Sequence, residues 1–255
     1  MAKIHLSDFP TKIIDKSQKE PIKKENEALV KEIIDFQRRM YADSRHSLLV
    51  IFQGMDAAGK DGATRKVFSG VNPLGIKVHS FKKPNAKELS YDFLWRIHKY
   101  VPAKGMIQVF NRSHYEDILV PSVEGYLSPD FIEPRYDQIN HFEQLLISGN
   151  NTTILKFYLH TSKEEQLKRL TERLEVPEKH WKHNDGDWVT REKWDEYLAV
   201  YERLFERCNS PEWHVIPSDR NWEKENHICK IILDAFKKMD LQYPSLQSQL
   251  FADKG

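Results

Sequence analysis

The sequence predicts an α/β protein in which helices cover both faces of a parallel sheet. Short apolar segments alternate with helical patterns along most of the chain, and this order is typical of parallel sheets because each crossover to the next strand needs a helix. The first apolar segment, residues 48–52, leads directly into a glycine-rich turn, as expected of a strand buried on both faces. Hydrophobic residues make up 40% of the 255 residues, which is enough for a sizeable core.

The charge balance and the hydropathy exclude several classes of protein. Lys and Arg number 39 and Asp and Glu 38, so a surface coated with basic groups for nucleic acid is not expected. The longest apolar run, residues 48–52, is far short of a membrane span, and the N-terminal residues lack the apolar core of a secretion signal. Two cysteines, Cys208 and Cys229, cannot form a disulfide framework. We therefore expect a cytoplasmic protein with neither a membrane nor a nucleic-acid partner.

The expected elements begin with an N-terminal extension and a helix, together residues 1–45. Residues 1–20 are polar and irregular, and we expect them to lie over the surface or in an interface between subunits. A charged helical pattern over residues 22–40 then precedes the first strand. Five strand candidates follow, at residues 48–52, 76–81, 106–110, 153–159 and 213–216.

Helical patterns separate these strand candidates. The predicted helices span residues 87–100, a segment opened by Pro134 and ended by Gly149, and residues 162–174, 190–207 and 222–237. Ser162 and Glu165 form a capping-box pattern at the start of the third of these helices. Its buried face is expected to consist of Leu167, Leu170 and Leu174. Residues 176–189 show no periodicity, and we expect a mobile loop there that could act as a lid.

The turn after the first strand carries the strongest motif. Its residues are Gly54-Met55-Asp56-Ala57-Ala58-Gly59-Lys60, which is the Gly-x4-Gly-Lys spacing of a phosphate-binding loop. Glycines allow the backbone to wrap so that successive N–H groups point at phosphate oxygens, and the following helix adds its positive N-terminal end. The lysine supplies a mobile charge for the terminal phosphates.

Two aspartates make this loop unusual. Asp61 stands where Ser or Thr normally binds Mg²⁺. Asp56 places a carboxylate inside a turn built to hold anions, which is unfavourable unless a cation neutralises it. We therefore expect Asp56 to bind Mg²⁺ directly or through water, with Mn²⁺ as an alternative ion.

Basic residues are concentrated around and after the loop. Between residues 57 and 87 the sequence has one acid, Asp61, and seven basic side chains: Lys60, Arg65, Lys66, Lys77, Lys82, Lys83 and Lys87. A single nucleotide needs two or three basic contacts, so this excess favours an extended polyanion. The alternative is that about half of these lysines only coat a solvated helix face.

A second group of polar residues follows the strand candidate at residues 106–110. Asn111 is a neutral ligand where comparable enzymes have an acid, and Arg112 could reach a phosphate in transfer. Glu116 or Asp117 could restore the missing negative charge one helical turn further on. His114 and Tyr115 lie between them, and we expect both to pack beneath the loop.

Arginines also lie next to the expected lid. Arg169 and Arg173 are one helical turn apart and could close over phosphates, and Lys182 adds positive charge within the lid. The alternative for Arg169 is an i,i+4 salt bridge with Glu165.

Together these segments resemble the polyphosphate kinase 2 family. The resemblance covers about residues 25–240 and is carried by residues 54–62, 92–99, 110–117, 177–182 and 213–219. It implies a P-loop kinase fold similar to thymidylate kinase, with a five-stranded parallel sheet, helices on both faces and a helical lid at about residues 160–190. The whole chain, residues 1–255, is expected to form a single domain. A homodimer or homotetramer is also implied.

The family resemblance implies a reaction as well. It is the reversible, Mg²⁺-dependent transfer of a phosphoryl group between inorganic polyphosphate and a nucleotide, so the expected ligands are polyphosphate, AMP, ADP and ATP. Asp56, Lys60 and Arg112 fall on the family's catalytic positions. Many members have Asp where this chain has Asn111, and the Asn version resembles the subgroup that phosphorylates both AMP and ADP.

The remaining expected contacts fall into two sets. Nucleotide contacts are expected at Asn111, Glu116 and Asp117. Contacts to phosphate or polyphosphate are expected at Gly54, Ala57, Ala58, Gly59, Asp61, Gly62, Lys66, Lys82, Lys83, Arg169, Arg173 and Lys182. Two other functions remain open at this point: an ATP-dependent nucleoside monophosphate kinase, and a regulator that binds nucleotides without turnover.

Overall fold

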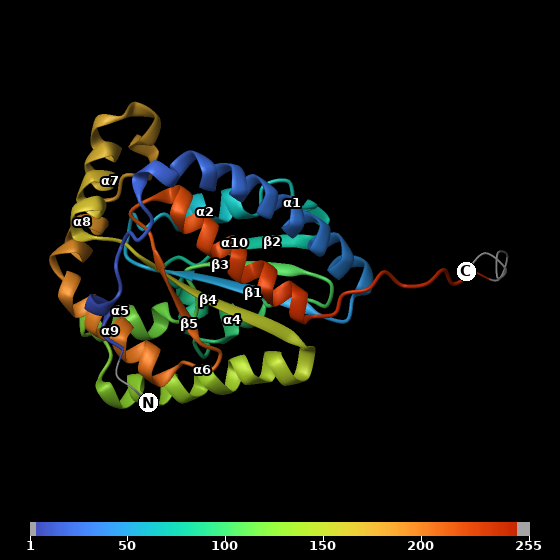
Figure 1. The fold of residues 1–255 in the computed structure, drawn as a ribbon. Coiled ribbons are helices and arrows are strands. Elements are labelled where there is room, and N and C mark those ends of the chain that lie inside the picture. The colour runs from blue at the N-terminus through green and yellow to red at the C-terminus, as the bar shows by residue number, and fades with distance from the viewer. Residues whose placement is uncertain (1–3, 249–255) are drawn as a thin grey trace.

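A parallel sheet organises the fold. The computed structural model describes residues 4–248, so the predictions for residues 1–3 and 249–255 lie outside it. Within the described residues the sheet has five parallel strands, as predicted, and their order is β2-β3-β1-β4-β5 (Figure 1). The strands are β1 (Ser47–Gln53), β2 (Ile76–Ser80), β3 (Ile107–Asn111), β4 (Thr152–His160) and β5 (Trp213–Pro217).

The central strand is β1, and it is buried along its whole length. It pairs with β3 on one side and β4 on the other, so that Phe52 lies opposite both Asn111 and Phe157. Because all strands are parallel, the loops after β1, β3, β4 and β5 leave the sheet at the same edge. In open α/β sheets, ligands bind outside this edge, at the point where the strand order reverses.

One face of the sheet is covered by three of the described helices: α1 (Lys19–Asp43), α2 (Lys60–Val67) and α10 (Asn221–Lys238) (Figure 1). Aliphatic side chains dominate the core on this side. Ile33 and Met40 of α1 and Ile232 and Phe236 of α10 are fully or almost fully buried there. The predicted helix over residues 22–40 therefore exists and is longer than expected.

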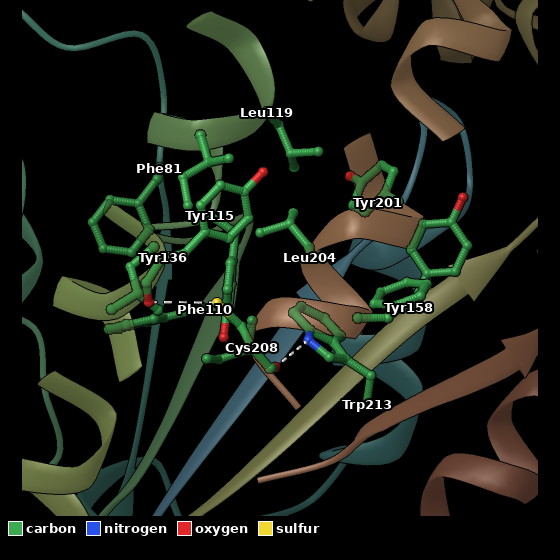
Figure 2. Close-up of a cluster of buried hydrophobic side chains, with 14 of the residues drawn as sticks. Phe81, Phe110, Tyr115, Leu119, Tyr136, Tyr158, Tyr201, Leu204, Cys208 and Trp213 are labelled. Carbon is green, nitrogen blue, oxygen red and sulfur yellow. Dashed lines mark hydrogen bonds between the residues drawn. The ribbon is translucent and has the colours of Figure 1, made fainter. Parts of the chain in front are cut away.

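The opposite face is covered by α4 (Trp95–His98), α5 (Glu116–Glu124), α6 (Pro129–Asn150) and α9 (Trp194–Arg207) (Figure 1). Its core is rich in aromatic rings (Figure 2). Trp213 Nε1 donates to the Cys208 carbonyl at 2.9 Å, and the ring packs edge-on against Tyr115. Cys208 and Cys229 are both buried free thiols.

A charged network lies inside this aromatic core. Lys156 Nζ donates to Glu143 Oε2 at 2.9 Å, and the Tyr115 hydroxyl donates to Glu143 Oε1 at 2.8 Å. His114 Nε2 lies 3.1 Å from the same oxygen. Burial alone would raise the pKa of Glu143, but Lys156 and His114 outweigh it and lower the pKa. His114 and Tyr115 are therefore packing residues, as predicted, and their side chains are fully buried in this core.

The predicted helix over residues 87–100 is wrong. The segment forms two short helices, α3 (Ala86–Leu89) and α4, with a break at residues 90–94. Asp92 Oδ1 accepts from the backbone N–H groups of Leu94 and Trp95, and this local cap starts a new helix instead of continuing the old one. Leu89, expected on a buried stripe, is 69% exposed as a result.

Three other helical predictions need correction. Helix α6 begins at Pro129 rather than Pro134, because both prolines suit a first turn and Ser128 precedes the earlier one. Helix α5, which contains Pro121, is a further helix that the sequence analysis does not include. On α7 (Lys163–Glu175) the buried face holds Gln166 and Leu170, while Leu167 and Leu174 are largely exposed.

The capping box predicted at the start of α7 is only half present. The Ser162 hydroxyl accepts from the Glu165 N–H, but the Glu165 carboxylate accepts from Arg169. The segment after α7, expected as an irregular loop, contains a 3₁₀ helix at Pro177–Lys182 and α8 (Asp185–Glu192). The helix predicted over residues 190–207 is divided accordingly between α8 and α9.

The buried Lys156–Glu143 pair generates a stability prediction. Lys156→Met should lower the free energy of unfolding by about 3 kcal/mol at pH 7, because Glu143 would remain buried without its ammonium partner. Urea unfolding measures the change. In the matched control Lys230→Met, an exposed pair with Glu25 is lost, and the change should stay within about 0.5 kcal/mol. Equal effects of the two substitutions would contradict the prediction.

Candidate functional site

The candidate site lies at the carboxyl edge of the sheet, in the segment that joins β1 to α2. We call residues 54–59 the glycine-rich loop. Gly54 has φ +143°, and a Cβ atom there would lie 2.8 Å from the Leu159 carbonyl oxygen of β4. Gly59 has φ +95° and precedes the first residue of α2. Both glycines are therefore required by the backbone, as the phosphate-loop motif predicts.

Lys60 folds back over the inside of this loop. Its side chain is buried, and Nζ donates to the carbonyls of Gly54 at 2.7 Å and Met55 at 3.1 Å. Burial lowers the pKa of the Lys60 ammonium to about 8, and the nearby charge of Arg112 adds to the effect. A buried ammonium held only by carbonyl oxygens is a strong site for an anion.

Arg112 faces the loop from the end of β3. It has a left-handed backbone (φ +62°), which is uncommon for arginine, and its guanidinium is hydrogen-bonded to the Asp56 carboxylate. On the other side of the guanidinium, Arg112 Nη1 lies 3.5 Å from Glu116 Oε2. Glu116 raises the pKa of Arg112 against the effect of burial, and Asp56 adds to it. An arginine shared by two carboxylates thus lies beside the glycine-rich loop.

The other predicted residues near β3 divide between two places. Asn111 Nδ2 donates to Asp61 Oδ1, which links the end of β3 to the first turn of α2. Asp117 pairs with Arg96 at 3.0 Å and lies apart from the Asp56–Arg112–Glu116 group, and burial raises the pKa of its carboxyl. Of the two acids that could restore the negative charge missing at Asn111, Glu116 lies against Arg112 and Asp117 pairs with Arg96.

Arg169 holds the loop from outside. Its Nη1 donates to the carbonyls of Ala57 at 3.0 Å and Ala58 at 3.2 Å, and its Nη2 donates to Ser218 and Asp219 after β5. The salt bridge with Glu165 is present as well, at 2.9 Å. The salt bridge within the helix is therefore confirmed, and Arg169 also reaches the loop through backbone oxygens.

The other basic residues predicted to bind phosphates have different surroundings. Arg173 binds the Asp187 carboxylate and the Lys182 carbonyl, and so joins α7 to α8. The Lys182 side chain is exposed and lies 5.0 Å from the Trp181 ring. The side chains of Lys66 on α2 and of Lys82 and Lys83 after β2 are exposed as well. Gly62, in the first turn of α2, has open space where a Cβ atom would stand.

A small cavity of about 40 Å³ separates the loop from α9. Asp56, Arg112 and Glu116 supply its charged wall. The Tyr201 hydroxyl, on its far side, accepts from the Gly54 N–H at 3.3 Å. Its complete lining is Gly54, Met55, Asp56, Arg112, Glu116, Leu119, Val120, Thr190, Tyr197 and Tyr201.

Sequence reasoning missed several of these contacts. Tyr197 and Tyr201 fit a helical core stripe, and their hydroxyl groups were the one signal that this stripe faces a polar site. Gln166 Nε2 donates to the Asp56 carbonyl at 3.0 Å, and Lys224 of α10 reaches the carbonyls of Ala58 and Gly59. These last two contacts join distant segments, and no local pattern indicates them.

The acids of the site suit a divalent cation that is also bound by phosphate. Among residues 4–248 no group of three or more His, Cys, Asp or Glu side chains is arranged to hold a metal by itself. Mg²⁺ bound to phosphate substrates, however, needs only one or two carboxylates and takes its other ligands from phosphate and water. Asp56 and Glu116, which line the same cavity, supply such a pair.

This geometry defines an α/β protein of the phosphate-loop kinase class. A family model described as Polyphosphate kinase 2 (PPK2) matches residues 16–244. The chain belongs to the polyphosphate kinase 2 family, as the sequence motifs predicted. Over residues 4–248, no helix is both long and apolar enough to cross a membrane.

Individual relatives agree with this assignment. The chain is 45% identical over 210 residues to the AMP/ADP-polyphosphate phosphotransferase of Meiothermus ruber, covering 82% of this chain and 78% of the relative. It is 40% identical over 261 residues to the ADP-polyphosphate phosphotransferase of Rhodopseudomonas palustris, covering 95% and 89%. The crystal structure of polyphosphate kinase 2 from Arthrobacter aurescens TC1 superposes with a TM-score of 0.88 at 38% identity, covering 92% and 85%.

The lowered pKa of Lys60 generates a pH prediction. Lysine is positive below its pKa, so the ligand-free protein loses this charge as the pH rises through about 8. The advantage of wild type over Lys60→Met in binding tripolyphosphate should therefore shrink about tenfold between pH 7 and pH 9. Titration calorimetry of both proteins measures the ratio of the dissociation constants, in which the ligand's own titration cancels. A ratio independent of pH would show that Lys60 does not bind the phosphates as a cation.

Proposed function

We propose that this protein transfers phosphoryl groups reversibly between inorganic polyphosphate and AMP, ADP or both. The main support for this proposal is that Lys60, Arg112 and Asp56 lie together at one glycine-rich loop. The relatives of this chain are also named polyphosphate phosphotransferases. Phosphoryl transfer needs little covalent help from a protein. It needs alignment of donor and acceptor and neutralisation of charge, and this loop offers both.

In the proposed mechanism the loop N–H groups and Lys60 bind the phosphates. Lys60 exchanges its contacts with the Gly54 and Met55 carbonyls for phosphate oxygens. Arg112 leaves Asp56 or Glu116 for the phosphoryl group in transfer, where its fork of donors stabilises the developing charge. Asp56, with Glu116 as a second carboxylate, would hold Mg²⁺ or Mn²⁺. When bound, this ion neutralises phosphate charge.

The remaining parts of the proposal concern the surroundings of the loop. Lys66, Lys82 and Lys83 would line the path of the polyphosphate chain, and Asn111, Glu116 and Asp117 would contact or position the nucleotide. Residues 160–190 would act as a lid, in which Arg173 and Lys182 close over the phosphates and exclude water. Arg169, predicted from the sequence to close over the phosphates as well, would instead hold the loop through the carbonyls of Ala57 and Ala58. We further propose that the chain forms one domain, assembles as a homodimer or homotetramer, and works in the cytoplasm.

Donor choice tests the proposed reaction. Purified protein given ADP, Mg²⁺ and polyphosphate should form ATP, and with AMP in place of ADP it should form ADP. Luminescence and chromatography measure the products, and omission of polyphosphate controls for disproportionation of ADP. Product that appears only with ATP as donor would instead identify an ATP-dependent nucleoside monophosphate kinase. Binding without any product would identify a regulator.

Substitution tests the assigned residues. Asp56→Asn and Lys60→Ala should each lower kcat/KM by about 10²–10³-fold, because each removes charge that the transition state needs. Circular dichroism should show that the fold survives. The matched control Lys23→Ala removes a half-exposed lysine of α1, and its activity should equal that of wild type. Wild-type activity in either site variant would refute its assigned role.

A further inference from the structure

A second buried lysine, Lys224 of α10, reaches the glycine-rich loop at the carbonyls of Ala58 and Gly59. Lys224 lies in the first turn of α10, and its side chain is fully buried. Its Nζ lies 3.0 Å from Asn221 Oδ1, 3.2 Å from the Gly59 carbonyl oxygen and 3.5 Å from the Ala58 carbonyl oxygen. The proposed mechanism makes no use of this ammonium group.

Lys224 and Arg169 together cover the carbonyl side of the loop. Arg169 binds the carbonyls of Ala57 and Ala58, and Lys224 binds those of Ala58 and Gly59. A peptide group whose carbonyl accepts from a cation becomes more polarised, so its neighbours in the hydrogen-bond chain donate more strongly. In a loop whose N–H groups serve as anion donors, cations behind the carbonyls strengthen the field at the front.

The second glycine of the motif makes this approach possible. A Cβ atom on Gly59 would lie 2.3 Å from Lys224 Nζ, closer than any real contact. The left-handed backbone (φ +95°) already favours glycine at this position, and a side chain there would also displace the Lys224 ammonium. The loop and the ammonium therefore fit each other closely.

The carbonyls of Ala58 and Gly59 would keep a hydrogen-bond donor even without Lys224. The Gly59 carbonyl also accepts from the Ala63 N–H at 3.0 Å, within α2, and the Ala58 carbonyl also accepts from Arg169. The hydrogen bonds of the Lys224 ammonium go to neutral oxygens, and burial lowers its pKa to about 7, with the Arg169 charge adding to the effect. A buried cation of this kind is unfavourable for the ligand-free fold.

We propose that Lys224 is a positioning residue of the anion site, which acts through the loop backbone and does not touch substrate. Its charge behind the carbonyls of Ala58 and Gly59 strengthens phosphate binding on the opposite side of the loop. A bound polyanion compensates the repulsion among Lys60, Arg169 and Lys224, so the ammonium is unfavourable in the empty protein and favourable in the loaded one. The proposal rests on the assignment of this loop as the phosphate site.

Two variants and one ligand test the proposal. Lys224→Met removes the charge and keeps the length of the side chain, and Lys224→Gln keeps a polar end. In both, the Tm of the ligand-free protein should equal or exceed that of wild type, while the dissociation constant for tripolyphosphate should rise about tenfold. Differential scanning fluorimetry and titration calorimetry at pH 6.5 measure the two quantities. Lys230→Met, on the exposed side of the same helix, should change neither.

Specific outcomes would overturn the proposal. A lower ligand-free Tm with unchanged tripolyphosphate binding would assign Lys224 a purely structural role. Wild-type binding in Lys224→Gln would show that its charge is not needed, and if Lys224→Met does not fold, Lys224→Gln alone decides. Lys60→Ala separates this inference from the proposed site: if that variant still binds tripolyphosphate like wild type, the site assignment fails, and if it does not, unchanged Lys224 variants refute only the role of Lys224.

Discussion

The concentration of cations around one turn of backbone is the constraint on which the rest of the structure depends. Lys60 lies inside the glycine-rich loop, Arg169 and Lys224 lie behind its carbonyls, and Arg112 faces it from β3. In the ligand-free protein these charges are satisfied by loop carbonyls and by the carboxylates of Asp56 and Glu116. The contacts of Lys60 and Arg112 occupy the donors that a phosphate chain would use, so these two side chains stay in place without the ligand.

The fold explains how so many charges are held together. Strand β1 is buried between β3 and β4 and fixes the start of the loop, while α10 and α7 bring Lys224 and Arg169 from distant parts of the chain. On the other face, the buried Glu143 binds His114 and Tyr115, which directly follow the Arg112 segment. The aromatic core of Figure 2 thereby anchors the arginine that faces the loop.

Much of this architecture is predictable from the sequence, because its signals are local. The five strands, the glycine-rich loop and the family follow from apolar runs and short motifs. One error arose at Asp92, where a local cap starts a new helix against the periodic pattern. Another arose at Pro134, which is typical of a helix start but lies inside α6. The roles of Arg169 and Lys224 could not be predicted, since their partners are backbone oxygens of a loop more than one hundred residues away in the sequence.

The most direct measurement is a crystal structure of the protein with tripolyphosphate and ADP. Our account predicts phosphate oxygens on the N–H side of the glycine-rich loop, in contact with Lys60. It also predicts that the Arg112 guanidinium has moved from Asp56 to a phosphate. Phosphates bound at another surface, with the Arg112–Asp56 pair and the Lys60 contacts to Gly54 and Met55 intact, would contradict it.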